Sequence, residues 1–339
     1  MSLSWFKITL KPPVQYRFPA AGLLLACAAA AAPTAGVRAT EVANLVDLLG
    51  WIATSRRAEP PAVEQDPEPI IVGRLATYRT SHDDTLADLA LRFNLGYVSL
   101  VAANPGIDPW VPGEGTEIVL PLAHLLPDAP REGIVINLPE MRLYLFDKDG
   151  GVQTYPLGVG REGLETPRGT TEIKRKAENP IWYPTAATRA DDPELPAAVP
   201  PGEDNPLGTR ALYLGWPAYL IHGTNRPYGI GRRTSRGCIR MYTEDVERLY
   251  PQVPVGTKVT VIDQPIKLGW SRGELYLEAH PTKAQADQLE INGAFDFELP
   301  DGLIERINAA AGQEANRLDW ATVRQAALER RGYPVKITR

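Results

Sequence analysis

Apolar and polar residues alternate with the period of a β-strand through much of residues 132–263. The apolar positions are rich in Val, Ile, Tyr and Phe, which favour strands, and Gly, Pro and Asp separate the runs. The expected strands lie at 134–138, 142–146, 152–159, 171–173, 211–213, 219–221 and 257–262. One helix is expected at 243–250, and 179–207 reads as a Pro-rich loop of a length that usually serves function. The pattern predicts a mainly β domain with few helices.

Residues 75–121 follow a different period. Leu86, Leu89, Ala90 and Phe93 recur at helical spacing after the possible caps Asp83 and Asp84. A second short helix is expected at 98–103, and apolar runs at 75–79 and 116–120 flank the two helices. The order strand, helix, helix, strand predicts a small α+β unit.

The first 39 residues have the pattern of an export signal. Lys7, Lys11 and Arg17 precede an apolar stretch at 18–32, and small residues follow it. We therefore expect residues 1–39 to be a signal peptide and the protein to act outside the cytoplasm. Leu24-Leu25-Ala26-Cys27 resembles a lipobox, so lipid anchoring at Cys27 is an alternative to simple cleavage.

The other segments connect or cover these units. Residues 40–74 and 122–131 are rich in Pro and are expected to be linkers. Residues 264–339 are expected to form an extension that packs on the β domain, with a hairpin at 266–277 and helices at 301–311 and 320–329.

Composition excludes several classes of function. The net charge of -5 argues against nucleic acid as a general partner. The four histidines, at positions 82, 124, 222 and 280, lack metal-ligand spacing such as His-Glu-x-x-His, so neither a metal nor a cofactor is expected.

The chemistry of the chain is concentrated between residues 222 and 240. This stretch contains His222-Gly223-Thr224 and, after a Gly/Arg-rich run, Ser235-Arg236-Gly237-Cys238-Ile239-Arg240. Cys238 is one of only two cysteines in the chain, the other being Cys27. Nearby arginines at 232, 233, 236 and 240 are expected to favour its thiolate, and His222 supplies an imidazole that titrates near neutral pH.

The whole pattern resembles the signature of the YkuD-type L,D-transpeptidases, and residues 166–169, Thr-Pro-Arg-Gly, resemble another element of that domain. The resemblance implies a β-sandwich over residues 132–263. It implies that Cys238 is the nucleophile and that His222 is the general base, its ring oriented by a backbone carbonyl. Backbone support is expected from Gly223 and Gly237. Substrate contacts are expected from Ser235, Arg236 and Arg240, although many members of the family have a second His at the position of Arg236.

Residues 75–121 resemble a LysM module, a family that binds N-acetylglucosamine-containing glycans such as peptidoglycan. The matching residues are Tyr78, Asp84-Thr85-Leu86, Leu89-Ala90, Arg92-Phe93, Asn104-Pro105, Gly113 and 118–121. Asp83 stands where the family usually has Gly. A packing unit that has lost sugar binding is the alternative.

Together the two resemblances indicate the ErfK/YbiS/YcfS/YnhG group of periplasmic or cell-envelope enzymes. The expected reaction attaches the third residue of a peptidoglycan stem peptide to Cys238, releases D-alanine, and passes the acyl group to an amine. That amine belongs to an envelope lipoprotein or to another stem. The alternatives are an L,D-carboxypeptidase and an inactive wall-binding adaptor. The interval from His222 to Cys238 fits neither papain-like peptidases nor sortases.

Overall fold

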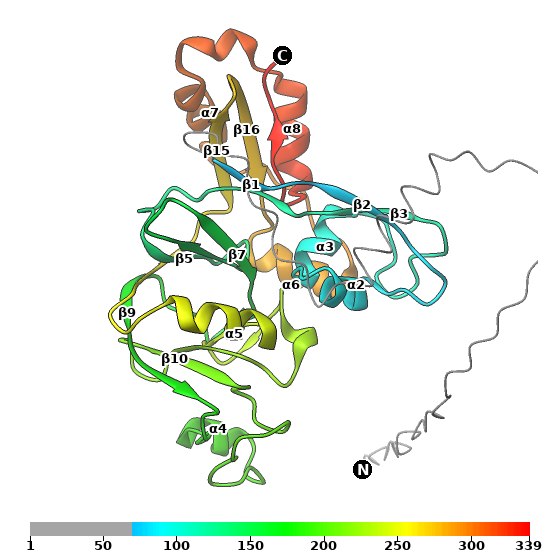
Figure 1. Cartoon of the computed structure of the whole chain (residues 1–339). Helices are drawn as coiled ribbons and strands as arrows, with labels where there is room; N and C mark the ends of the chain where they lie inside the picture. The colour runs from blue at the N-terminus through cyan, green and yellow to red at the C-terminus, as the bar shows by residue number, and fades with distance from the viewer. Residues whose placement is uncertain (1–69) are drawn as a thin grey trace, which may run out of the picture. The chain divides into compact units, whose positions relative to one another are not determined.

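An eight-stranded sheet in the order β13-β11-β10-β9-β14-β5-β6-β7 organises the part of the chain that the structure describes, residues 70–339 (Figure 1). The structure is a computed structural model. The predicted signal peptide, Cys27 and most of the first expected linker lie outside the described residues. The prediction of a mainly β domain with few helices is confirmed for residues 132–263.

β14 joins two groups of strands in this sheet, and the pairs within each group are antiparallel except that of β11 with β13, which is parallel. The strands are β5 (Gly133–Asn137), β6 (Arg142–Phe146), β7 (Val152–Pro156), β9 (Gly169–Glu178), β10 (Arg210–Leu214), β11 (Leu220–His222), β13 (Ile239–Arg240) and β14 (Lys258–Ile262). β14 runs parallel to β5 and antiparallel to β9. The helix α5 (Thr243–Gln252) packs against β10 and buries Val246 and Leu249.

The single strand expected at 152–159 is divided in two. β7 ends at Pro156, whose nitrogen has no proton to donate to a neighbouring strand. Two residues later the chain forms β8 (Val159–Gly160), which pairs with β12 (Arg233–Ser235) in a separate small sheet. This small sheet is separate from the main sheet and includes residues 233–235 of the 222–240 stretch.

The order strand, helix, helix, strand is present in residues 75–121. The elements are β2 (Ala76–Arg79), α2 (Leu86–Arg92), α3 (Tyr97–Ala103) and β3 (Glu117–Leu120), and β2 pairs with β3. Thr85, and neither Asp83 nor Asp84, caps α2, because its side chain accepts a hydrogen bond from the Asp88 amide. Asp84 is instead buried and accepts hydrogen bonds from Ser81 and Tyr78.

The stretches expected to be linkers on either side of this unit contain strands. β1 (Ile71–Gly73) pairs with β4 (Ala123–Leu125). All three residues of β4 are buried, and the Leu126 amide donates to the Ile70 carbonyl. The hydrophobic core is also continuous, because buried residues of α2 and α3 such as Leu86 and Leu100 belong to one cluster with residues of the main sheet. The unit is therefore integrated with the β domain.

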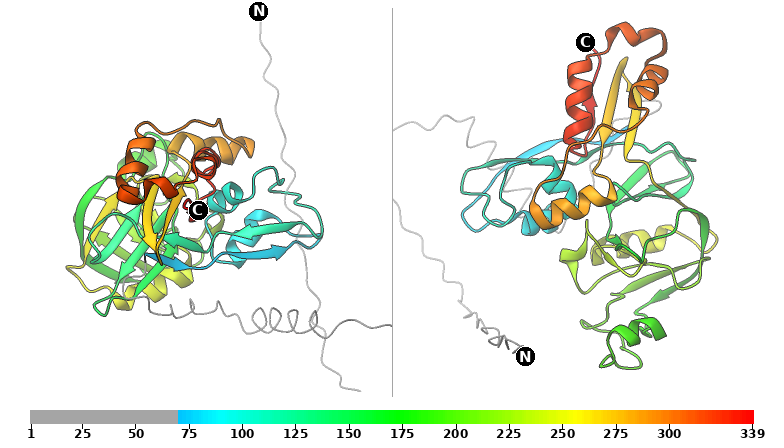
Figure 2. Two further views of the ribbon diagram at one scale, coloured as in Figure 1. Left: turned by 90° about the horizontal axis from the view of Figure 1, so that it is seen from above. Right: turned by 180° about the vertical axis from the view of Figure 1, so that it is seen from behind.

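The C-terminal residues form a second layered structure with its own core. The strands β15 (Ile266–Ser271), β16 (Glu274–Ala279) and β17 (Val335–Lys336) make a three-stranded sheet, and α7 (Leu303–Ala311) and α8 (Trp320–Glu329) pack on it. The hairpin and both helices were predicted. The helix α6 (Lys283–Asn292) was not, although Thr282 and Gln285 form a capping box at its start. α6 lies against α3, and the two helices are seen near one another in both views of Figure 2.

Across residues 70–339 no single helix has the length and apolar character needed to cross a membrane, and only the bent pair α2 and α3 meets those criteria jointly.

A buried cluster of charged residues joins the C-terminal structure to the β domain. Lys267 Nζ lies 2.9 Å from Glu140 Oε1 and 2.8 Å from Glu278 Oε1, and all three side chains are almost fully buried. Lys267 also donates to the Leu125 carbonyl of β4 at 2.6 Å. His124, Glu140 and Glu278 offer potential metal ligands within 4.8 Å of one another, but the ammonium of Lys267 already bonds both carboxylates. The cluster is therefore a network of buried ion pairs that holds the C-terminal structure against the β domain.

The cluster also determines how these carboxyl groups titrate. Burial raises the pKa of the Glu278 carboxyl, but the Lys267 ammonium and the neighbouring His124 and His280 outweigh it, and the pKa falls to about 2. Burial also raises the pKa of Glu140, but the charge of Lys267 lowers it, and the pKa lies well below its usual value. A carboxyl whose pKa falls on folding stabilises the protein above its unfolded pKa of about 4.3, and this stabilisation is lost as the pH falls toward 2.

Lys267→Met should lower the free energy of unfolding by about 3–5 kcal/mol at pH 7, because two buried carboxylates lose their cation. The loss should shrink below about pH 4.3, where protonation removes the uncompensated charge. Urea denaturation at pH 7 and pH 4 measures both effects. Lys258→Met, which breaks an exposed pair with Glu132, is the control and should cost less than about 1 kcal/mol. Equal losses of unfolding free energy in the two variants would show that the buried ion pairs of Lys267 do not hold the two structures together.

Candidate active site

Two adjacent parallel strands bring His222 and Cys238 together. His222 is the last residue of β11, and Cys238 directly precedes β13. In the pairing of these strands Ile221 lies opposite Ile239 and His222 lies opposite Arg240. Side chains alternate between the two faces of a strand, so His222 and Arg240 share a face, and Cys238, two residues before Arg240, belongs to that face as well. The structure thus joins the two ends of the sequence motif.

Hydroxyl groups fix the turn that presents Cys238. The Ser235 hydroxyl accepts a hydrogen bond from the Gly237 amide at 3.1 Å and donates one to the Cys238 carbonyl at 2.6 Å. The Thr166 hydroxyl donates to the Gly237 carbonyl at 2.8 Å. Ser235 is 1% exposed, so its hydroxyl supports the turn and is not placed to make the substrate contact expected of it. Thr166 was not predicted as a site residue, although the Thr-Pro-Arg-Gly sequence marked its position.

Gly237 is required in this turn for two reasons. Its φ of 103° is one that residues with a side chain rarely adopt. A Cβ atom at this position would also lie 2.7 Å from Cε1 of Tyr219, inside van der Waals contact. The absence of a side chain at Gly237 therefore lets the turn pack closely against the Tyr219 ring.

Burial, more than the arginines, sets the acidity of the thiol. Cys238 is partly exposed, and its Sγ donates a weak hydrogen bond to the Ala218 carbonyl at 3.4 Å. Burial raises the pKa of the Cys238 thiol, while the Leu220 backbone and the Arg240 charge lower it by less. The expectation of an arginine-stabilised thiolate is therefore wrong for the free protein, where the thiol form is favoured.

A backbone carbonyl orients the imidazole of His222, as the family resemblance implied. His222 Nδ1 lies 2.6 Å from the Gly223 carbonyl oxygen. A carbonyl only accepts hydrogen bonds, so Nδ1 carries the proton and Nε2 has a free lone pair. Burial, followed by the Arg240 charge, lowers the pKa of His222 to about 4, against a smaller opposing effect of the Gly223 hydrogen bond. His222 is therefore neutral at physiological pH and is able to accept a proton.

Three of the four neighbouring arginines form ion pairs in the structure. Arg240 lies opposite His222, and its charge acts on both His222 and Cys238. Arg236 pairs with Asp191 on α4 (Ala186–Asp191). Arg232 and Arg233, which were expected to favour the thiolate of Cys238, instead form ion pairs with two acidic residues of α6. Their side chains are only 14% and 7% exposed, and the partners are Glu290 and Asp287.

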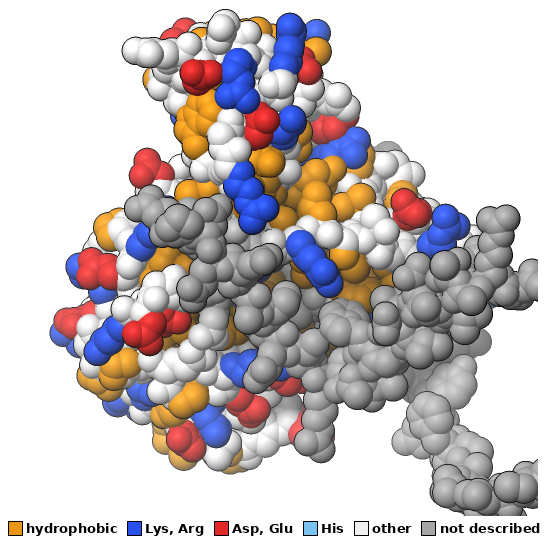
Figure 3. All heavy atoms as spheres, turned by 45° about the horizontal axis from the view of Figure 1, so that its top comes forward, with side chains coloured by type: hydrophobic (Ala, Val, Ile, Leu, Met, Phe, Trp, Pro, Cys, Tyr) orange, Lys and Arg blue, Asp and Glu red, His pale blue; other side chains and the backbone are white. Residues whose placement is uncertain are grey.

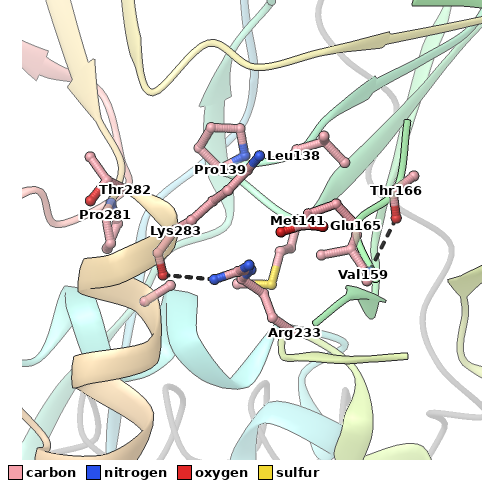
Figure 4. A pocket seen from close by; sticks show the side chains of 12 residues that line it. Leu138, Pro139, Met141, Val159, Glu165, Thr166, Arg233, Pro281, Thr282 and Lys283 are labelled. Atoms are coloured by element: carbon pink, nitrogen blue, oxygen red, sulfur yellow. Dashed lines mark hydrogen bonds between the residues drawn. The ribbon is translucent and has the colours of Figure 1, made fainter. Parts of the chain in front are cut away.

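Figure 4 shows how Arg233 reaches α6. Its guanidinium points toward the start of α6 and donates to the Lys283 carbonyl at 3.0 Å. The pocket in this view is lined by Thr166 and Glu165 on one side and by Lys283 on the other. Because Thr166 also holds the Cys238 turn, the C-terminal structure packs directly behind the site.

The Pro-rich loop at 179–209 contacts both ends of the motif. Asn205 is fully buried and folds the loop on itself, donating to the Pro180 carbonyl at 2.8 Å and accepting from the Leu207 amide at 2.9 Å. Beyond it, Gly208 packs so closely on Gly223 that a Cβ atom would lie 3.0 Å from the Gly223 Cα. The pair of Asp191 with Arg236, described above, holds the other end.

Comparisons with known proteins agree on one family. The model of the YkuD L,D-transpeptidase catalytic domain matches residues 131–261. The chain is 38% identical over 277 residues to the probable L,D-transpeptidase ErfK/SrfK of Salmonella typhimurium, covering 79% of this chain and 88% of that protein. It is 40% identical over 281 residues to the ErfK/SrfK protein of Escherichia coli, with coverage of 79% and 87%. It is 36% identical over 301 residues to the probable L,D-transpeptidase YbiS of Escherichia coli, with coverage of 86% and 95%.

The acidities of Cys238 and His222 predict the pH dependence of thiol labelling. Alkylation of Cys238 by iodoacetamide should rise steadily above neutral pH and show no plateau between pH 5 and 7, because His222 is not protonated until about pH 4. Arg240→Gln should move the labelling midpoint to higher pH, since it removes a charge that favours the thiolate. Arg236→Gln, which removes an arginine equally close in sequence but paired with Asp191, should leave the midpoint in place. Peptide mass mapping of the Cys238 adduct gives the rates, and a plateau at pH 5–7 would indicate a preformed thiolate–imidazolium pair.

Proposed function

The chain belongs to the L,D-transpeptidase family, and on that premise we propose that Cys238 is its acyl-accepting nucleophile and His222 its general base. The observation that carries this proposal is the pairing of β11 with β13, which sets a neutral imidazole and a partly exposed thiol on one face of the sheet. L,D-transpeptidases act on the stem peptides of peptidoglycan, so the substrate class is a stem that ends in D-alanine.

The first half of the reaction forms a thioester. Cys238 Sγ attacks the carbonyl carbon of the third stem residue as His222 Nε2 takes the thiol proton. The negative charge develops on the carbonyl oxygen, where backbone amides near Gly237 and Cys238 are the donors that stabilise it. Collapse of this intermediate breaks the peptide bond, and His222 returns the proton to the departing D-alanine amine. The low pKa of His222 suits this step, because a weakly basic imidazole gives up the proton readily.

The second half transfers the acyl group. An amine attacks the thioester, His222 takes a proton from it, and the thiol of Cys238 is restored when that proton returns to sulfur. Carboxylates of the stem need a cation near Cys238. Arg240 fills this role better than Arg236, whose guanidinium is already bonded to Asp191.

The amine acceptor is a lysine of an envelope lipoprotein, either in preference to the amine of a second stem or in addition to it. The support for this is the loop at 179–209, which contacts the motif through Gly208 on one side and Asp191 on the other. A loop anchored at both ends restricts what reaches Cys238, and a chain terminus is narrower than a neighbouring stem that is attached to its glycan.

The unit at 75–121 is a LysM module that binds the glycan. Its support is the loop between α3 and β3, where Trp110 is 62% and Val111 73% exposed. Backbone hydrogen bonds hold this loop beside the start of α2 and the residues before it. The Leu86 amide donates to the Pro109 carbonyl at 2.8 Å, and the Gly115 amide donates to the Thr80 carbonyl at 2.7 Å. Exposed aromatic rings provide the flat apolar surface against which sugars stack.

Wall binding then depends on such specific contacts. On the face drawn in Figure 3, Lys and Arg side chains are interspersed with Asp and Glu, and the chain has a net charge of -5. An acidic protein gains nothing from long-range attraction to an anionic wall.

The enzyme acts in the periplasm or cell envelope, and residues 1–39 are the signal peptide that directs its export. Lipid attachment at Cys27 is the alternative to cleavage.

The reaction is tested with purified tetrapeptide muropeptides and mass spectrometry of the products. The parental protein should release D-alanine, and Cys238→Ala should reduce turnover to background with little loss of stability, because a partly exposed sulfur contributes little to packing. His222→Ala should also abolish turnover while Cys238 still alkylates slowly at high pH. Turnover in Cys238→Ala would refute the assignment of the nucleophile.

The same reaction, supplemented with a peptide that carries a C-terminal lysine, identifies the acceptor. Products that join the stem to this peptide support protein attachment. Products that join only stem to stem would overturn it in favour of cross-linking, and release of D-alanine without any joined product would indicate an L,D-carboxypeptidase.

The glycan-binding proposal is tested by sedimentation with isolated sacculi. Trp110→Ala should weaken binding by about tenfold, because one stacking aromatic ring contributes on the order of 1 kcal/mol. Trp320→Ala, which removes a partly exposed Trp from α8, is the matched control and should bind as the parental protein does. Equal binding by the two variants would contradict a glycan site at Trp110. Binding without any turnover by the parental protein would favour the inactive adaptor.

A further inference from the structure

The start of α3 is completed by residues that lie between His222 and Cys238. The amides of a helix's first turn have no partner inside the helix, and the N-cap residue of α3, Gly96, has no side chain to supply one. The carbonyls of Ile230 and Gly231 take its place, accepting from the Tyr97 amide at 3.3 Å and the Val98 amide at 3.1 Å. We call residues 223–237 the connecting loop and residues 94–98 the helical turn. The helical turn thus depends on the connecting loop for its backbone hydrogen bonds.

The two segments approach as closely as backbones can. A Cβ atom on Gly231 would lie 2.1 Å from the Tyr97 nitrogen, and one on Gly96 would lie 2.9 Å from the Gly231 Cα. No side chain separates them, so a displacement of the helical turn is transmitted directly to the connecting loop.

Arg232 ties the connecting loop to two other parts of the chain. Its guanidinium carbon lies 3.6 Å from the centre of the Tyr97 ring, a stacked cation–π contact, and its Nη1 lies 2.7 Å from Glu290 Oε1 on α6. Its backbone carbonyl accepts from the Val159 amide at 3.1 Å. One residue of the loop is therefore held at once by the helical turn, by the C-terminal structure and by the β domain.

The helical turn also touches the chain after Cys238. The Tyr242 hydroxyl donates to the Leu95 carbonyl at 3.0 Å, and Asn94 Nδ2 donates to Asp245 Oδ1 at 3.2 Å. Tyr242 and Asp245 lie at and just beyond the start of α5, and both are buried. The helical turn therefore contacts the chain both before and after Cys238.

We propose that the helical turn is a positioning element of the active site, which holds the connecting loop so that Cys238 and His222 meet in the geometry required for acyl transfer. This inference rests on the proposed function of these two residues. It gives the unit at 75–121 a role in the reaction itself, independent of glycan binding. Tyr97 is the residue in which the contact is concentrated, since its amide bonds Ile230 and its ring stacks on Arg232.

The test compares Tyr97→Leu with two matched variants of the full chain. Tyr97→Phe keeps the ring that stacks on Arg232. Tyr78→Leu removes a ring of the same unit that also lies near an arginine, but one that bonds Asp84 and Arg92 and not the connecting loop. The measurements are kcat and KM on a soluble tetrapeptide stem that lacks glycan, the pH midpoint of Cys238 alkylation by iodoacetamide, and the Tm.

Tyr97→Leu should lower kcat by about ten- to a hundredfold with KM unchanged, because a displacement on the order of 1 Å is sufficient for such a loss. It should also shift the alkylation midpoint. Tyr97→Phe should retain the parental values, and Tyr78→Leu should lower Tm without changing kcat or the midpoint. If both leucine variants lower Tm and leave kcat and the midpoint at parental values, the helical turn only contributes packing and the proposal is overturned.

A second variant and a second readout keep the outcome clear. Should Tyr97→Leu fail to give a cooperative unfolding transition, Gly96→Ala replaces it, because its φ of −79° accommodates alanine and only the contact with Gly231 is disturbed. A parental protein that does not turn over the stem refutes the proposed function. A shift of the alkylation midpoint in Tyr97→Leu but not in Tyr78→Leu would still support the positioning role in that case.

Discussion

The site depends on the short parallel pairing of β11 with β13. Only two residue pairs define it, Ile221 with Ile239 and His222 with Arg240, yet it converts a histidine and a cysteine that are separate in sequence into neighbours on one face. Such a short pairing has little stability of its own. The hydroxyls of Ser235 and Thr166 fix the turn before it, and the buried side chains of Ile221 and Ile239 anchor it in the main core.

The surroundings of Cys238 and His222 favour the neutral form of both side chains in the free protein. Burial acts against charge on each, raising the pKa of Cys238 and lowering the pKa of His222. Arg240 opposes the first effect and reinforces the second, so it favours thiolate while disfavouring imidazolium. In the proposed reaction, full proton transfer before substrate binds is therefore unfavourable, and the negative charge that develops on the substrate's oxygen makes it favourable.

The sequence predicted the local features and missed those that depend on distant residues. Alternation located the strands, and the motif located His222 and Cys238, because both signals are contained in short windows. The ion pairs of Arg232 with Glu290 and of Lys267 with Glu140 join segments far apart in the chain, so no local pattern revealed them. The same limit explains the expected linkers. Pro-rich composition does not indicate that β1 and β4 will pair across the whole unit between them.

The place of β14 in the sheet constrains the order in which the chain is able to fold. β14 is the strand that joins β9 to β5, and it follows residues 222–240 in the sequence. The two halves of the sheet thus remain separate until residues 258–262 become available, and many native contacts span a long stretch of chain. High contact order of this kind is associated with slow folding. During synthesis, the thiol of Cys238 therefore belongs to an incomplete sheet until residues 258–262 have paired.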